Sequence, residues 1–143
     1  MAARASETQK SAKKDYINTV GRRREASARV RLYRGKDENL VNGQVIGKYF
    51  PGKVMATKWK KPFELTGTFG KYYITAKVAG GGNSGQLDAV VHATSKAFSA
   101  LDPEKFRTPL KNAVLLSRDS RVRERRMVGT GGRARKQKQS PKR

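Results

Sequence analysis

A glycine run between two predicted elements has the composition and spacing needed to bind a phosphate group. Residues 80–85 read Gly-Gly-Gly-Asn-Ser-Gly and match the G-x-G-x-x-G pattern of dinucleotide-binding turns. That pattern also requires a second parallel strand ending in an acidic residue about twenty positions later, whereas Asp102 stands before Pro103 at a predicted helix start. We therefore expect no nicotinamide binding.

The same glycines are also suited to bind a phosphate group that is not part of a dinucleotide. Without side chains, Gly80, Gly81 and Gly82 let the backbone approach a phosphate closely, and a helix that starts behind them offers free N–H groups. We call Gly80–Gly82 the glycine turn. The alternative is a tight strand-to-helix connection that holds no ligand.

Three side chains on the following helix have the composition of a hydrolytic trio. Asp88, His92 and Ser95 are spaced i, i+4 and i+7, so they share one helical face. A nucleophile must meet its base beside oxyanion donors, whereas side chains stacked on one exposed face lie open to water. We expect no hydrolase chemistry and predict an exposed polar face, continued by Lys96 and Ser99.

Arginines cluster around a predicted strand. Arg22, Arg23 and Arg24 are consecutive, and Arg29 and Arg31 follow on the outward face of the alternating segment Ala28–Tyr33. Guanidinium groups bind phosphates through two parallel hydrogen bonds, so this cluster predicts a positive, phosphate-binding surface. The alternative is a run of charge that serves only solubility.

The last twenty-six residues form the second basic segment. Residues 118–143 hold eleven lysines and arginines against Asp119 and Glu124, and they contain too few apolar side chains to build a core. Asp119 and Glu124 can orient the arginines beside them while the segment stays cationic. A polyanion is therefore the expected partner, with nucleic acid favoured and a localisation signal as the plainer alternative.

Bulk composition agrees with a nucleic-acid partner. The chain has 143 residues, a formal net charge of +22, one histidine and no cysteine. Cysteine zinc sites and disulfides are excluded, and we expect no metal and no cofactor. Residues 1–14 lack the apolar segment of a secretory signal, so we expect an intracellular protein; organelle import is the weaker alternative. No long amphipathic basic helix is visible, which disfavours a membrane surface.

The elements that must position these residues can be predicted from periodicity. An Asn-Gly pair at 42–43 predicts a tight hairpin turn, and the apolar stripe that starts at Leu87 predicts an amphipathic helix. Residues 53–68 show no clear pattern, and no stacking role is assigned to Trp59 or the tyrosines at 16, 33, 49, 72 and 73. The predicted elements are strands at Ala28–Tyr33 and Lys71–Val78, a hairpin at Leu40–Val45, a helical turn at Ile46–Phe50, and helices at Ser84–Ala100 and Pro103–Lys111. This order predicts an α+β fold, a two-layer sandwich with the helices on one face of the sheet.

Four segments resemble a known family. GRRREASARVRLYRG, VNGQVIGKYF, KYYITAKVAGGGNSGQLDAVVHATSKAF and LLSRDSRVRERRMVG, with the basic end that follows, are similar to bacterial-type small-subunit ribosomal protein number nine. The resemblance runs from about Tyr16 to the C-terminus. It implies a non-enzymatic αβ domain on the head of the small subunit, with a left-handed crossover like the second domain of small-subunit ribosomal protein number five.

The resemblance also implies partners and site residues. It divides the chain into a basic extension (1–14), a globular domain (15–117) and an extended tail (118–143), located in the cytoplasm on the ribosome beside other head proteins. Lys142 and Arg143 are expected to approach the anticodon stem-loop of peptidyl-site tRNA; this chain ends Ser-Pro-Lys-Arg, with Pro141 added to the usual Ser-Lys-Arg. The residues expected to contact small-subunit ribosomal RNA are Arg22, Arg23, Arg24, Arg29, Arg31, Gly80, Gly81, Gly82, Arg118, Arg121, Arg123, Arg125, Arg126, Arg133, Arg135 and Lys136.

Two other classes of protein remain as alternatives to a ribosomal protein. A free nucleic-acid-binding module, chromatin-like or regulatory, would bind duplex DNA as readily as structured RNA. A nucleotide-dependent enzyme would bind its cofactor saturably at moderate salt and would depend on Gly82.

Overall fold

Two long antiparallel strands begin the computed structural model, which describes residues 15–128. β1 (Tyr16–Arg23) pairs with β2 (Ala26–Arg34), and Arg23 lies opposite Ala26 across the turn. The even-numbered positions of β2 from Ala26 to Leu32 are buried, whereas Arg29 and Arg31 are exposed. The period of two predicted from the sequence is confirmed, and it gives β2 one apolar and one cationic face.

The sheet is completed by three further strands. β5 (Tyr72–Ala79) pairs antiparallel with β2 and parallel with β3 (Leu40–Val41), and β4 (Gln44–Val45) is joined to β3 by a hairpin. The strand order is β1-β2-β5-β3-β4. Asn42 and Gly43, at the hairpin tip, both have positive φ angles of 50° and 82°, which is the type I′ geometry predicted from the Asn-Gly pair.

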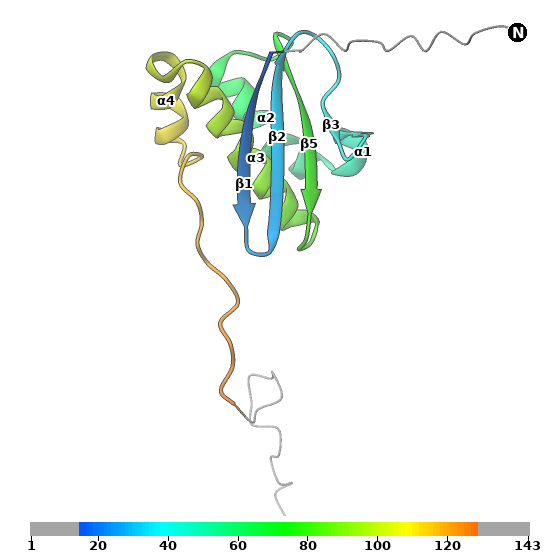
Figure 1. The fold of residues 1–143 in the computed structure, drawn as a ribbon, viewed down its shortest axis with the longest axis vertical. Helices are drawn as coiled ribbons and strands as arrows, with labels where there is room; N and C mark the ends of the chain where they lie inside the picture. Colours follow the sequence, from blue (N-terminus) through cyan, green and yellow to red (C-terminus); the bar gives the residue numbers. More distant parts are fainter. Residues whose placement is uncertain (1–14, 129–143) are drawn as a thin grey trace, which may run out of the picture.

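Helices cover one face of the sheet and leave the other open (Figure 1). They are α1 (Ile46–Tyr49), α2 (Lys53–Thr66), α3 (Asn83–Leu101) and α4 (Pro103–Asn112). The core lies between the layers and includes Phe98, Phe63 and Leu87, all fully buried. The predicted α+β class is therefore confirmed, with the helices on one face. Among the described residues, no helix is long and apolar enough to span a membrane.

Two elements were not predicted from the sequence. The sequence of β1 lacks the apolar alternation of a typical half-buried strand, because Gly21 and Arg23 occupy inward positions. Pro62 interrupts the helical pattern of α2, yet Trp59, Pro62 and Phe63 form a buried stripe at i, i+3 and i+4. The spacing of that stripe was the available signal.

β1 and α3 pack unusually close together, and Gly21 makes this possible. A Cβ atom added to Gly21 would lie 2.7 Å from the Ala93 backbone nitrogen and would also overlap the Ala89 carbonyl oxygen. Two side-chain hydrogen bonds join the elements: Thr19 Oγ1 donates to the Ala93 carbonyl (2.8 Å), and Lys96 Nζ donates to the Val20 carbonyl (3.1 Å). α3 is therefore fixed along the outer strand of the sheet.

The chain reverses where α4 ends. The N–H of Val114 donates to the Lys111 carbonyl (2.9 Å) and that of Leu115 to the Leu110 carbonyl (3.1 Å), with Val114 in the left-handed region at φ 59°. This is the bond pattern of a Schellman motif. It sends residues 113–121, which we call the tail root, back past α3 before the chain extends away from the domain (Figure 1).

Candidate nucleic-acid interface

The arginine turn, residues 22–25, and the glycine turn lie side by side at one end of the sheet. Ser27, at the start of β2, is opposite Ala79, at the end of β5. A Cβ added to Gly80 would lie 2.6 Å from the Glu25 carbonyl oxygen, and one added to Gly81 would lie 3.1 Å from the Ala26 Cβ. Both glycines also have positive φ angles, 76° and 61°. Residues that are far apart in sequence thus form one surface because β2 and β5 are neighbours.

The glycine turn presents the start of α3 to that surface. Gly82 is the N-cap residue, and no side chain caps the first N–H groups of this helix. Such groups carry partial positive charge and accept anions as hydrogen-bond partners. The predicted strand–glycine–helix connection is therefore present. Occupation of the turn by a phosphate stays a prediction.

A chain of polar side chains holds the glycine turn in place. Gln86 Nε2 donates to the Gly80 carbonyl (3.0 Å), and Gln86 Oε1 accepts from the Tyr49 hydroxyl (2.9 Å). Asn42 pairs with the backbone of Val78 through both ends of its amide, at 3.1 Å and 2.9 Å. The Asn-Gly hairpin thus supports β5 just before the glycine turn, a role that turn propensity alone did not predict.

Arg23 has a different place from its neighbours Arg22 and Arg24. Its side chain is only 11% exposed and forms ion pairs with Asp119 (3.0 Å) and Asp88 (3.8 Å), while Nη1 donates to the Arg121 carbonyl (3.2 Å). The guanidinium therefore joins β1, α3 and the tail root. Of the three consecutive arginines, Arg23 thus forms its contacts within the protein, whereas Arg22 and Arg24 are exposed. The predicted contacts of all three with RNA stay predictions.

Asp119 orients an arginine of the tail root, as its position in the sequence predicted. Its two carboxylate oxygens accept hydrogen bonds from Arg121 Nε (3.0 and 3.1 Å) and Nη2 (2.8 Å), and Oδ1 also accepts from the Arg121 backbone N–H (3.0 Å). These hydrogen bonds, with the charges of Arg121 and Arg23, hold the pKa of Asp119 well below its usual range and raise that of Arg121. The second acid, Glu124, forms no ion pair among the described residues.

The face of α3 that carries Asp88, His92 and Ser95 is covered, contrary to the exposed face predicted from its polarity. Ser95 is fully buried and donates to the Val91 carbonyl (2.8 Å), and Asp88 pairs with Arg23 and Lys58. His92 Nε2 bonds to the Leu116 carbonyl at 3.1 Å. The tail root covers this face because the chain reverses after α4. The three side chains do not form a nucleophile–base relay.

His92 is held neutral by its surroundings. Because a carbonyl can only accept, Nε2 carries the proton, and Nδ1 is buried without a hydrogen-bond partner. Burial lowers the pKa of His92, and the charges of Lys96 and Arg118 lower it further, while the bond to Leu116 opposes them. His92 thus supports the tail root as an uncharged donor.

The open face of the sheet combines cations with tyrosines. Arg29 and Lys77 are register partners, and Arg31 lies between Asn18 and Thr75. At one end, the Tyr33 ring packs against Tyr16 (centroids 5.4 Å apart) and stacks on Tyr73 (5.1 Å), and the Arg31 guanidinium lies 5.1 Å from the Tyr16 centroid. Arg29 and Arg31 are exposed, as predicted.

The remaining predicted cations lie along the extended segment. Arg118, Arg123, Arg125 and Arg126 are exposed, and Arg121 is exposed although it is paired with Asp119. Five further predicted contacts lie outside the described residues: Arg133, Arg135, Lys136, Lys142 and Arg143. The structure therefore brings the arginine turn, glycine turn and tail root together, whereas Arg29 and Arg31 belong to the open face.

Comparisons with known proteins all find relatives from one protein family. A family model described as ribosomal protein S9/S16 matches residues 21–143. A protein of Maridesulfovibrio salexigens named small ribosomal subunit protein uS9 is 44% identical over 119 residues, which is 83% of this chain and 91% of the relative. A protein of the same name from Desulfotalea psychrophila is 44% identical over 82% of this chain and 90% of the relative. Another, from Gemmatimonas aurantiaca, is 42% identical over 90% of this chain and 98% of the relative.

Proposed function

This chain belongs to the ribosomal protein S9/S16 family, and from that membership we propose that it is a structural constituent of the small ribosomal subunit. Its proposed task is to bind small-subunit ribosomal RNA. The observation that carries this proposal is the meeting of the arginine turn, the uncapped start of α3 and the tail root at one end of the sheet. Cations and free N–H groups from three distant segments face the same region.

Charge neutralisation is the proposed mechanism. Exposed arginines replace the counterions of closely spaced phosphates, and the released ions favour the complex. Arg22 and Arg24 supply this at the turn, and Arg118, Arg123, Arg125 and Arg126 supply it along the tail. Arg23 acts indirectly in this proposal, since it fixes the direction in which the tail leaves the domain.

The finer parts of the proposal concern the two ends of the chain. Residues 1–14 are a basic extension, residues 15–117 form the domain, and residues 118–143 are a tail whose Lys142 and Arg143 reach the anticodon stem-loop of peptidyl-site tRNA. Pro141 fixes one backbone angle next to these cations. Neighbouring head proteins complete the partners, and the location is the cytoplasmic ribosome.

Two further features belong to the same proposal. The protein is proposed to have no enzymatic activity: Asp88 pairs with Arg23, His92 is bonded to the Leu116 carbonyl, and the buried Ser95 donates to the Val91 carbonyl. The connection from β3 through α1 and α2 to the parallel strand β5 is a left-handed crossover, as in the second domain of small-subunit ribosomal protein number five. The parallel pairing of β3 and β5 requires a crossover connection, and its left hand is part of the proposal.

Sedimentation tests the assignment to the small subunit. A cell lysate is separated on a sucrose gradient at low magnesium, and this chain is quantified by mass spectrometry. Stoichiometric recovery with the small subunit is expected. Recovery with DNA or at the top of the gradient would overturn the proposal in favour of a free nucleic-acid-binding module.

Removal of Lys142 and Arg143 tests the tail tip. Subunits that carry the truncated chain should assemble normally but hold peptidyl-site tRNA more weakly, because two cations leave the anticodon stem-loop. tRNA dissociation from purified subunits is the measurement. Unchanged dissociation would exclude the tip from tRNA binding and leave the RNA-binding proposal standing.

A further inference from the structure

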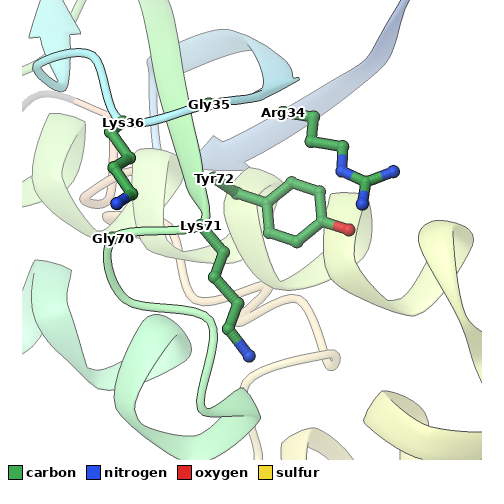
Figure 2. Close-up of a pocket in the computed structure, with 6 residues that line it drawn as sticks. All are labelled: Arg34, Gly35, Lys36, Gly70, Lys71 and Tyr72. Carbon is green, nitrogen blue, oxygen red and sulfur yellow. The ribbon is translucent and has the colours of Figure 1, made fainter.

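A second cationic site lies at the opposite end of the sheet from the arginine turn. A cavity of about 300 Å³ is lined by Arg34, Gly35, Lys36, Gly70, Lys71 and Tyr72 (Figure 2). Arg34 and Tyr72 are cross-strand partners at one end of β2 and β5, whereas Ser27 and Ala79 pair at the other. Strand geometry places these ends roughly 20–25 Å apart. The cavity is therefore separate from the surface described above, and its cations were not among the residues predicted to bind RNA.

The backbone of this site is fixed. The N–H of Gly35 donates to the Lys71 carbonyl (2.9 Å), and that of Lys71 donates to the Thr68 carbonyl (3.0 Å). Thr68 is buried and is itself bonded to the end of α2 through its N–H and the Phe63 carbonyl (3.1 Å). Tyr72 packs against Phe98 of the core. Two loops from distant parts of the sequence are thus held together, so the cavity exists without a ligand.

The cationic side chains of the site are uncompensated. Arg34, Lys36 and Lys71 project from its rim (Figure 2), all three are exposed, and none forms an ion pair with a described carboxylate. No acidic residue lines the cavity. Asp37, the acid that follows Lys36, instead interacts with the Tyr73 hydroxyl on the other face of the sheet; burial raises the pKa of Tyr73, and Asp37 raises it further.

We propose that this cavity binds one phosphodiester group of the ribosomal RNA, at a position distinct from the RNA held by the arginine turn and tail. The inference rests on the proposed function. The uncompensated cations around a fixed backbone notch attract a negatively charged phosphodiester, and guanidinium and ammonium groups are the side-chain donors that bind phosphate oxygens. An exposed aromatic side chain, Phe69 (57% exposed), precedes Gly70 and offers stacking surface to an adjacent unpaired base.

The test uses the full-length chain and small-subunit ribosomal RNA. The variant Lys36→Gln with Lys71→Gln removes two cations that have no described internal partner. Its matched control, Lys105→Gln with Lys111→Gln, removes two exposed lysines of α4, which lie outside both surfaces. Affinity is measured across a series of salt concentrations. The site variant should reduce the magnitude of the salt slope by about 0.7–0.9, equal to one phosphate contact, and the control should leave the slope unchanged.

Lysine acetylation in the complex supplies an independent readout. Lys36 and Lys71 of the wild-type chain should be protected by naked ribosomal RNA, relative to the free protein. Protection only in the complete subunit would overturn the inference and assign the site to an acidic segment of a neighbouring protein. Equal slopes for site variant and control would also overturn it. Failure of the wild-type chain to bind RNA would instead overturn the proposed function itself.

Discussion

At the residue scale, His92 makes the stability of this protein depend on pH. Burial lowers its pKa in the folded state below the ordinary value of 6.5. The unfolded chain therefore binds more protons between the two pKa values, and stability falls as the pH drops through and below 6.5. The variant His92→Gln retains a donor for the Leu116 carbonyl but cannot titrate in this range.

Urea unfolding at pH 7.5 and pH 5.5 measures this effect. We expect the wild type to lose more free energy of unfolding between these conditions than His92→Gln does. Equal losses would show that His92 does not titrate differently in the folded and unfolded states.

Asp119 gives a second prediction, with the same sign in a lower pH range. Its hydrogen bonds to Arg121, with the charges of Arg121 and Arg23, lower its folded pKa from 3.8, so its contribution to stability is complete above about pH 4 and declines as the pH falls toward the lowered pKa. At neutral pH, Asp119→Asn should mobilise the tail root, because Arg23 and Arg121 lose their shared partner. Backbone ¹⁵N relaxation of residues 117–121 is the measurement. Glu124→Gln is the matched control and should leave these residues unchanged, whereas equal mobilisation by both variants would contradict the anchoring role.

The contacts of some single residues could not be predicted from the sequence. The sequence indicates that the Arg23 guanidinium binds an anionic group, but not which one. Both carboxylates that form ion pairs with it, those of Asp88 and Asp119, are more than sixty positions away in the sequence. In the same way, the polarity of the α3 face was visible, but the tail root that covers it was not. Long-range pairing of charges decides these outcomes, and local periodicity carries no information about it.

At the scale of elements, the contact between β1 and α3 depends on the missing side chain of Gly21. Gly21→Ala should lower the free energy of unfolding by about 1–3 kcal/mol, because the added methyl group overlaps the backbone of α3. Gly47→Ala is the matched control, since a Cβ there meets nothing within 4 Å, and within helix α1 it should raise stability by about 0.4–1 kcal/mol. Urea denaturation measures both. A small effect of Gly21→Ala would mean that β1 and α3 can separate slightly at little cost.

The elements with a regular pattern were predictable from the sequence. β2, β5, α3, α4 and the Asn-Gly hairpin all follow from spacing and turn chemistry, and their observed bounds differ from the predicted ones by only a few residues. β1 and α2 did not follow, because each has an atypical residue at an inward position: Gly21 and Arg23 in the strand, and Pro62 in the helix. Tertiary contacts, with α3 in one case and the core in the other, override the local signal.

At the scale of the whole molecule, the distribution of charge predicts strongly salt-dependent RNA binding. Replacement of Arg118, Arg123 and Arg125 by Gln should reduce the magnitude of the slope of log K against log salt by about 2–3, at 0.7–0.9 per phosphate. Filter binding to small-subunit ribosomal RNA across a salt series is the measurement. A wild-type salt slope that corresponds to only one or two phosphate contacts would contradict an extended interface.

The hydrogen bond from Lys96 to the Val20 carbonyl has a consequence for the edge of the sheet. β1 is an outer strand, and its unpaired backbone groups could template pairing with a second chain. Lys96 occupies one of those carbonyls, and its charge, with that of Arg22 on the same strand, repels an equally basic copy. The side chain thus disfavours edge-to-edge pairing between two copies of this chain.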